Sequence, residues 1–188
     1  MQGNPCDSLQ TLKDVVRCYI RCCRPVALEE LQEFQNLTNL SEAVELAGTA
    51  RTTDQKKFDH QWRIPNNTLM KFSKHLRTRL KRIKDSKDFE SLRSVIHESG
   101  VEGIGRLTVY DTALRIGANL GFRPAHIYLH AGTTEGAKAL GLYRGQEWLD
   151  PNEMPVEFRL LEPREIEDCL CIYKDDLKRI ARTKLTIT

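Results

Sequence analysis

Long apolar runs are missing from this sequence of 188 residues. No window approaches the ~18 consecutive apolar residues of a membrane span, and the first residues lack the basic stretch and apolar core of a secretory signal. No internal repeat or low-complexity tract appears either. We therefore expect a soluble cytoplasmic protein that makes no contact with a membrane.

The six cysteines occur without the C-x-x-C spacing of common structural zinc sites. A chain of this length buries enough surface to fold without disulfides, so we expect reduced thiols in the core, no metal and no cofactor. One alternative stays open. Cys18 and Cys22 lie at i and i+4, and pairing of the terminal helices could bring Cys169 or Cys171 to them around a zinc ion.

Alternating Val/Ile runs, which are typical of strands, are also scarce. Apolar residues recur at intervals of three and four, and this period predicts helices almost throughout. We expect an all-α helical bundle with one strand at residues 156–161 and an ordered loop at 49–66. In that loop Trp62, next to His60 and Arg63, is interpreted as buried packing, with base stacking as the alternative. Helices are predicted near residues 9–24, where Pro25 ends the first one, and near 27–34, 41–48, 67–84, 86–98, 108–120, 133–140 and 163–180.

Charge is unevenly distributed along the chain, although the formal net charge is only +3. Between Arg51 and Lys84, eleven Lys/Arg stand against two Asp, so this segment carries +9 and the rest of the chain −6. Such a basic block indicates contact with a polyanion, of which nucleic acid is the first candidate. A solvated helix face is the alternative. Lys71, Lys74, Arg77 and Lys81 are the candidate contacts.

The most specific motif is Gly103-Ile104-Gly105-Arg106, which lies between two predicted helices. Glycines permit a tight turn and a close approach of backbone to a ligand. The N–H groups at the start of the second helix, from Arg106 to Thr108, then form an anion site suited to a backbone phosphate. We therefore expect Gly103, Ile104, Gly105, Arg106 and Thr108 to bind DNA.

These residues resemble the helix-hairpin-helix motif of DNA-binding and DNA-repair proteins. Residues 89–142 also resemble the base-excision glycosylase branch, in which the second hairpin helix leads through an extended segment into another helix. The resemblance implies a helix-hairpin-helix domain over residues 41–142. Residues 1–40 and 143–188 would then form a second lobe, in which the terminal helices pair.

The chain departs from that family at its catalytic positions. Bifunctional members carry a lysine two residues after the second hairpin glycine, and this position is Leu107. Monofunctional members keep an aspartate near the start of the later helix, where this sequence reads His130-Ala131-Gly132. The four-cysteine run with which some members hold an iron–sulfur cluster is missing as well. The resemblance therefore implies a glycosylase-like scaffold without the standard glycosylase chemistry.

Two alternatives to a non-catalytic DNA-binding protein remain. In the first, the chain is a monofunctional glycosylase or related hydrolase that uses Asp111, His130 or Glu135 in place of the missing aspartate. The favoured explanation of Asp111 is that it is a structural partner of Arg115 at i+4, and that of His130 is that it hydrogen-bonds a neighbouring helix end. In the second alternative, the chain is a regulatory module that binds a partner protein.

Overall fold

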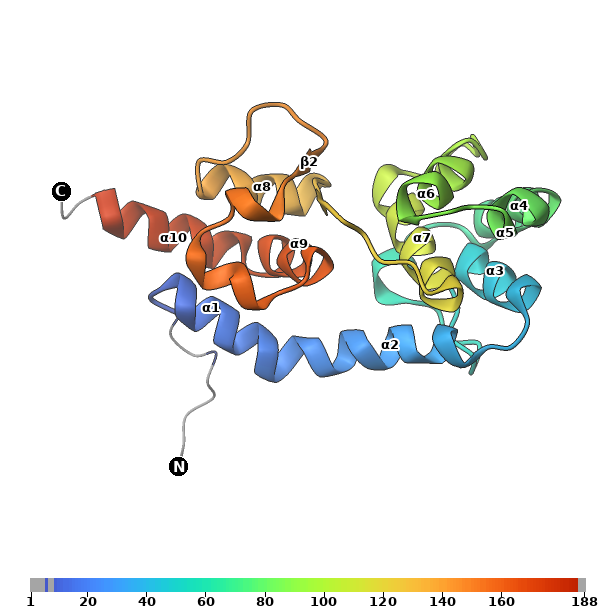
Figure 1. The fold of residues 1–188 in the computed structure, drawn as a ribbon, viewed down its shortest axis with the longest axis horizontal. Helices are drawn as coiled ribbons and strands as arrows, with labels where there is room; N and C mark the ends of the chain where they lie inside the picture. Colours follow the sequence, from blue (N-terminus) through green and yellow to red (C-terminus); the bar gives the residue numbers. More distant parts are fainter. Residues whose placement is uncertain (1–5, 7–8, 186–188) are drawn as a thin grey trace. The chain divides into compact units, whose positions relative to one another are not determined.

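The computed structural model describes residue 6 and residues 9–185, which form mostly helices and a two-stranded sheet (Figure 1). This confirms the predicted all-α character. The chain divides into two compact units: unit 1 comprises residues 1–27 and 125–188, and unit 2 comprises Leu28–Pro124. Both junctions differ from the expected ones at residues 40 and 142. Residues 125–142 pack with the C-terminal helices, and residues 28–40 pack in unit 2, where the Asn119 side chain donates to the carbonyls of Phe34 and Leu37.

Unit 2 contains the central helices, and its core is made by their apolar stripes. The buried side chains include Phe34, Phe72, Leu92 and Ile116. After α2 (Arg24–Asn36) enters the unit, the chain forms α3 (Leu40–Thr49), the 3-10 turn η2 (Asp59–Gln61), α4 (Asn66–Thr78), α5 (Leu80–Lys84), α6 (Phe89–His97) and α7 (Arg106–Leu120).

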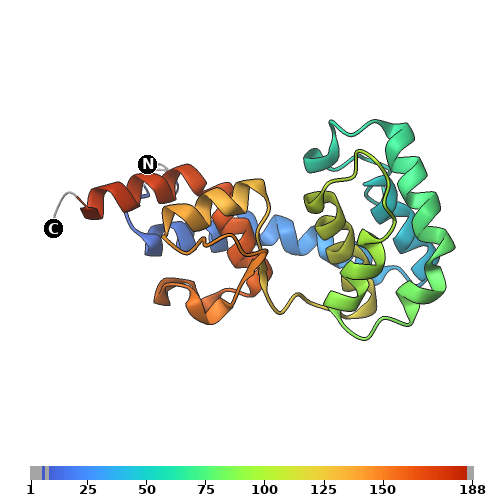
Figure 2. The same cartoon turned by 90° about the horizontal axis from the view of Figure 1, so that it is seen from above.

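Capping residues explain where several of these helices begin and end. Asp88 and Ser91 form a capping box at the start of α6. Gly121 ends α7 in the left-handed conformation, at φ 78°, as the sequence predicts. The helix predicted over residues 67–84 is interrupted at Arg79 (φ −102°, ψ 10°), and α5 then continues the course of α4 (Figure 2).

Unit 1 combines the N-terminal helix with the C-terminal part of the chain around a second core. That core includes Tyr19, Phe158 and Leu170, all fully buried. Its elements are α1 (Leu12–Cys18), the π-helical turn η1 (Tyr19–Cys23), β1 (Ile127–Tyr128), α8 (Ala131–Ala139), β2 (Trp148–Leu149), the 3-10 turns η3 (Pro151–Glu153) and η4 (Val156–Leu160), α9 (Pro163–Ile172) and α10 (Lys174–Leu185). β1 and β2 pair antiparallel, with Ile127 opposite Leu149.

Close packing between α8 and α9 places residues 125–142 in unit 1. A Cβ atom added to Gly136 would lie 2.2 Å from the carbonyl oxygen of Leu170, and one added to Gly132 would lie 2.5 Å from Sγ of Cys171. Only glycine allows the two helix backbones to approach this closely. The sequence predicts that residues 125–142 lie with the hairpin helices, because nothing in it indicates that α8 packs against α9.

The prediction that Pro25 ends the first helix is wrong. The chain stays helical from Leu12 through Pro25 to Asn36, because a π-helical turn precedes the proline. In that turn the N–H of Arg24 donates to the carbonyl of Tyr19, five residues back. The widened turn accommodates a residue that contributes no N–H of its own.

The prediction of a strand at residues 156–161 is also wrong, because Val156–Leu160 is a 3-10 turn. The N–H of Phe158 donates to the carbonyl of Pro155, and Phe158 enters the core while Val156 and Leu160 stay exposed. A strand would place Val156, Phe158 and Leu160 on the same side. The two strands of the described chain are instead β1 and β2, each of two residues.

The expectation that all cysteines are reduced is wrong for two of them. Cys6, in the segment before α1, forms a disulfide with Cys18 at the end of α1. Cys22, Cys23, Cys169 and Cys171 remain as thiols.

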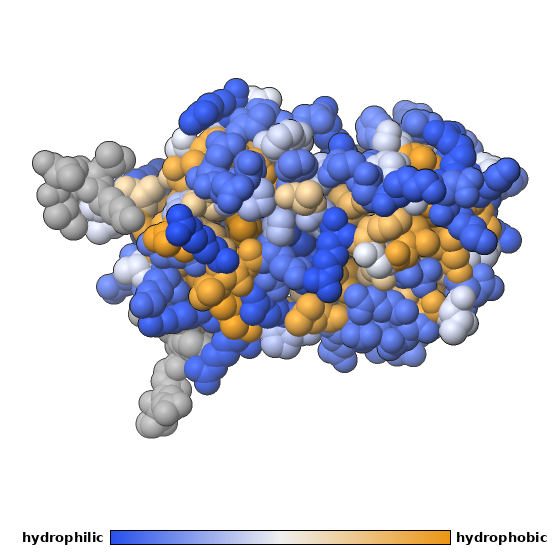
Figure 3. All heavy atoms as spheres, in the orientation of Figure 1, coloured by the Kyte–Doolittle hydropathy of each residue, from blue (hydrophilic) through white to orange (hydrophobic). Residues whose placement is uncertain are grey.

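The surface contains mostly hydrophilic residues, with hydrophobic ones between them, on the face drawn in Figure 3. Within the part of the chain that the structure describes, no helix combines the length and the apolar character needed to cross a membrane.

Candidate nucleic-acid interface

The connection between α6 and α7 forms an exposed hairpin in unit 2. Gly100 and Gly103 adopt positive φ angles of 60° and 86°, and the N–H of Ile104 donates to the carbonyl of Val101 at 3.1 Å. Gly105 is the N-cap of α7 and provides no side-chain hydrogen bond to the first helical N–H groups. The start of α7 therefore presents backbone donors and the positive end of the helix dipole at the surface.

Helix α4 holds this hairpin from one side. Nδ1 of His75 lies 3.2 Å from the carbonyl oxygen of Ser99, and the Arg79 guanidinium donates to the carbonyl of Glu98 at 3.1 Å. At the other end of α4, a Cβ added to Gly103 would lie 3.4 Å from Cγ2 of Thr68. One face of α4, carrying Thr68, His75 and Arg79, thus lies against the hairpin.

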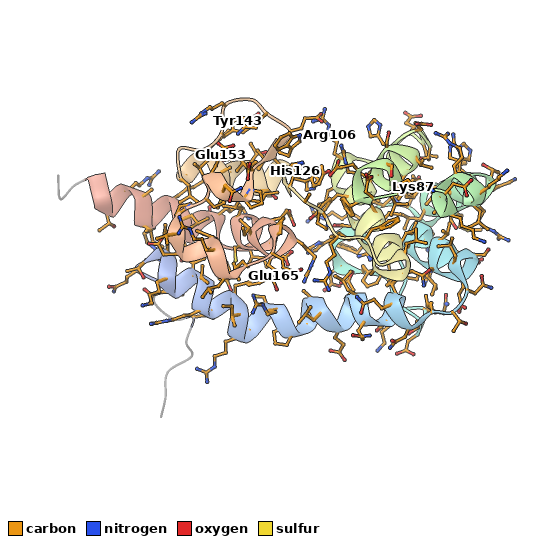
Figure 4. All side chains as sticks on the ribbon, in the orientation of Figure 1. Lys87, Arg106, His126, Tyr143, Glu153 and Glu165 are labelled. Atoms are coloured by element: carbon orange, nitrogen blue, oxygen red, sulfur yellow. A yellow bond between two sulfur atoms is a disulfide. The ribbon has the colours of Figure 1, made fainter. Side chains whose placement is uncertain are left out.

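Lys71 belongs to that same face. It follows Thr68 by three residues and precedes His75 by four, and residues at these spacings neighbour each other on a helix. Lys74 follows Lys71 by three residues and extends the positive surface away from the hairpin. Both side chains are exposed and have no ion-pair partner among the described residues. The exposed Arg106 side chain, at the start of α7, is labelled in Figure 4.

Two of the predicted contacts lie elsewhere. Arg77 is on the side of α4 that faces α3, where its guanidinium pairs with Glu45 at 3.5 Å. The Thr108 side chain is buried, with 7% of its surface exposed, so only its backbone N–H can contribute to an anion site. Lys81, on α5, is exposed. The structure thus brings Lys71 of α4 to the side of the hairpin that carries Gly103, Ile104, Gly105 and Arg106, whereas Lys74 lies on an adjoining side of α4.

The interpretation of Trp62 as buried packing is wrong, because 65% of its surface is exposed. Its loop is nevertheless firmly held. Nζ of Lys57 donates to the carbonyls of Trp62 and Ile64, at 3.1 and 2.6 Å, and lies 3.3 Å from Oδ1 of Asn66. The Arg63 guanidinium lies 5.7 Å from the centre of the indole ring. The loop therefore fixes the backbone next to an aromatic side chain that stays in solvent.

Gln61, one residue before Trp62, joins the loop to α7 through a buried polar cluster. Its amide nitrogen donates to Oδ2 of Asp111, and its amide oxygen accepts from the Arg115 guanidinium at 3.4 Å. Arg115 also pairs with Glu30 at 2.9 Å and stacks on the ring of Phe58, 3.6 Å from its centroid. Burial raises the pKa of Asp111 to about 6.

The three candidate catalytic residues do not converge within either unit. Asp111 belongs to unit 2, with its carboxylate buried against Gln61, whereas His130 and Glu135 belong to unit 1. His130 is the N-cap residue of α8, and its carbonyl accepts from the N–H of Thr134 at 2.7 Å. The Glu135 carboxylate lies 2.9 Å from Nζ of Lys138 and 3.2 Å from Nζ of Lys178.

The acidic stretch of α9 is largely internal to unit 1. Glu165, which is labelled in Figure 4, pairs with Arg24 at 2.7 Å, and Arg24 lies at the junction between the π-helical turn and α2. The hydroxyl of Thr133 donates to the buried Glu167 at 2.6 Å, and the hydroxyl of Tyr19 donates to Asp168 at 2.7 Å. These carboxylates therefore have partners inside their own unit.

Sequence reasoning missed Gln61 and misjudged the exposure of Trp62. The concentration of polar and aromatic residues at 60–63 was a signal, but no periodicity shows which of two adjacent loop residues turns inward. Sequence reasoning also missed Arg79, whose guanidinium donates to the carbonyl of Glu98, and Arg82, which pairs with the Glu98 carboxylate. Nothing in the sequence except their charge distinguishes these two residues.

No protein-family model, curated protein or solved structure shows a significant match to this chain.

Proposed function

We propose that unit 2 binds DNA through a helix-hairpin-helix formed by α6, the hairpin and α7, together with the basic face of α4. The observation that carries this proposal is the contact between the hairpin and the Thr68–His75 face of α4. Lys71 lies on that face, and neither Lys71 nor Lys74 forms an ion pair in the described part of the chain. Backbone N–H groups and lysines together suit the phosphates of a DNA strand.

The exposed Trp62 supplies a second kind of contact in this proposal. An aromatic ring beside positive charge stacks on bases whatever their sequence. The loop that carries Trp62 is already held by Lys57 and Gln61, so the ring is positioned before a ligand arrives. Unpaired bases are therefore the nucleic-acid feature that this exposed ring fits best.

Standard glycosylase chemistry is not part of the proposal. Leu107 stands where bifunctional members of the resembled family carry their lysine, and Asp111 is buried with Gln61 on its carboxylate. The Glu135 carboxylate forms ion pairs with Lys138 and Lys178. Each candidate carboxylate thus has a structural partner that competes with a catalytic role.

The hairpin tests the proposal, because one of its positions can be changed without disturbing the fold. Gly105 has ordinary backbone angles (φ −87°, ψ 173°), and a Cβ added there meets no heavy atom within 4 Å. Valine at this position blocks the approach of a phosphate to the N–H groups but leaves α7 intact. We expect Gly105→Val combined with Arg106→Ala to weaken the binding of a labelled DNA duplex roughly 10-fold or more, measured by fluorescence anisotropy.

The control for this variant is its circular dichroism spectrum and thermal midpoint, which we expect to match those of the wild-type protein. Equal affinity of variant and wild type, or no binding by either, would refute the proposal.

A further inference from the structure

Three cysteines gather in unit 1, which contains none of the residues used in the proposed function. The Sγ atoms of Cys6, Cys18 and Cys22 lie within 4.8 Å of one another. Cys6 and Cys18 form the disulfide, whereas Cys22 is an exposed thiol whose Sγ lies 3.5 Å from Sγ of Cys6. A thiol beside a disulfide is the arrangement from which thiol–disulfide exchange starts.

The other sulfur of the disulfide has a hydrogen-bond donor in place. The hydroxyl of Tyr173 donates to Sγ of the buried Cys18 at 3.2 Å, and Sγ of Cys23 lies 3.3 Å from the same hydroxyl. Burial raises the pKa of Tyr173 above its ordinary value, so the hydroxyl keeps its proton and remains a donor. This donor stabilises the negative charge that Cys18 acquires when its bond to Cys6 breaks.

The remaining cysteines face other neighbours. Cys23 lies against the Tyr173 hydroxyl, Cys169 is fully buried, and Cys171 packs where α9 approaches Gly132 of α8. Of the four thiols, Cys22 is the one that combines exposure with closeness to the disulfide. Attack in line with the Cys6–Cys18 bond requires the Cys22 side chain to turn about its Cα–Cβ bond, and its exposure leaves room for this movement.

We propose that Cys22 exchanges with the Cys6–Cys18 disulfide and converts it into a Cys6–Cys22 disulfide at the protein surface. Cys22 gives its proton to solvent, and the thiolate attacks Sγ of Cys6. The bond between Cys6 and Cys22 forms, the bond between Cys6 and Cys18 breaks, and the electron pair leaves on Cys18, which then takes up a proton. No net oxidation occurs.

This exchange gives the site a class of ligand. Cys18 is buried, so its disulfide is shielded on one side from reagents in solution, whereas Cys22 is exposed. The Cys6–Cys22 form therefore presents a disulfide that soluble thiols such as glutathione, or the dithiols of other proteins, can reduce. Exchange among the three cysteines would thus move the disulfide from a buried position to one that thiols in solution can reach.

The two disulfides can be told apart by trypsin, because Arg17 and Arg21 are cleavage sites and the Arg24–Pro25 bond resists cleavage. Cys6 falls in peptide 1–13, Cys18 in peptide 18–21, and Cys22 with Cys23 in peptide 22–51. The full-length protein is equilibrated in a buffer of reduced and oxidised glutathione with a chelator, and free thiols are alkylated at acid pH. Digestion at mildly acid pH and mass spectrometry then report which peptides are linked.

We expect wild-type protein to yield both linked pairs, 1–13 with 18–21 and 1–13 with 22–51. Cys22→Ser should lose the second pair and keep the first, and Cys18→Ser should yield the second alone. Cys23→Ser, the matched control in the same peptide, should leave both pairs in place. Wild-type protein that never links 1–13 to 22–51, or that loses this link in Cys23→Ser, would overturn the proposal even if Cys18→Ser fails to fold.

Discussion

Gln61 joins the long connection between α3 and α4 to helix α7. Its amide group bonds to Asp111 on one side and to Arg115 on the other, so a loop residue completes a buried polar cluster. An unpaired carboxylate or guanidinium in this position would cost several kcal/mol. The same anchoring fixes the neighbouring Trp62 in an exposed position.

Trp62 gives a prediction about the ligand. Because stacking of a base on an aromatic ring contributes roughly 1–3 kcal/mol, we expect Trp62→Ala to weaken binding of a single-stranded oligonucleotide by about 5-fold to 150-fold. Anisotropy of a labelled oligonucleotide measures this change. The matched control is Trp148→Ala, which removes the other tryptophan, 44% exposed and stacked on His126 in unit 1. An equal loss in both variants would argue against a specific role for Trp62.

Asp111 gives a prediction about stability and pH. Its pKa rises from 3.8 in the unfolded chain to about 6 in the folded protein. Between these values the folded state binds more protons than the unfolded state, so this group makes stability fall as pH rises from about 4 to about 6. We expect Asp111→Asn to remove that fall and to raise the free energy of unfolding at pH 7.5 by on the order of 1–3 kcal/mol.

Urea denaturation at pH 4.5 and pH 7.5 measures this effect. Asp59→Asn, in the exposed part of the same loop, is the control and should show the wild-type difference between the two pH values. If Asp111→Asn lowers stability equally at both pH values, the carboxylate is needed in its charged form and the predicted direction is wrong.

At the scale of elements, the contact between α8 and α9 determines how unit 1 is assembled. Replacing glycine by alanine inside a helix normally stabilises it by about 1 kcal/mol. At Gly136 we expect the opposite, a loss of roughly 1–3 kcal/mol, because the new Cβ would lie 2.2 Å from the carbonyl oxygen of Leu170.

The thermal midpoint of Gly136→Ala, followed by circular dichroism, checks this prediction. Gly105→Ala is the matched control, since its Cβ has no neighbour within 4 Å. A midpoint of Gly136→Ala at or above that of the wild type would mean that α8 and α9 do not pack this closely.

Helix periodicity predicted most of the elements, because each helix buries one apolar stripe. The residues of α7 show this best, since Gly121 also marks its end. Local sequence patterns predicted the wrong backbone conformation at two places. Val156–Leu160 looks like a strand but is a 3-10 turn, and no strand among the described residues pairs with it. The helix continues through Pro25 because a π-helical turn precedes the proline.

The candidate site was predictable to a similar degree. Glycines and lysines identified the hairpin and the basic helix, but only the fold shows that Lys71 lies beside the hairpin while Arg77 faces Glu45. The sequence also did not predict the disulfide between Cys6 and Cys18 or the position of Cys22 next to it. Twelve residues separate Cys6 from Cys18, and their pairing depends on how the segment before α1 folds.

At the scale of the whole molecule, the two units carry different charge. Unit 1 contains thirteen Lys/Arg and thirteen Asp/Glu, whereas unit 2 contains sixteen against thirteen, so unit 2 accounts for the whole formal charge of +3. The net charge of −6 that the residues outside 51–84 carry also belongs to unit 2, because unit 1 is neutral. Within unit 2, positive charge is thus concentrated in residues 51–84 and negative charge in the other residues. A polyanion is expected to select its basic segment.

The salt dependence of DNA binding tests the account most directly. Each phosphate neutralised by a lysine adds about 0.9 to the slope of log affinity against log salt concentration. For a labelled duplex, Lys71→Ala with Lys74→Ala should lower the steepness of that slope by roughly 2 relative to wild type. Lys13→Ala with Arg17→Ala, which removes the same charge from the exposed face of α1 in unit 1, should leave the slope unchanged. Equal slopes for all three proteins would contradict the account.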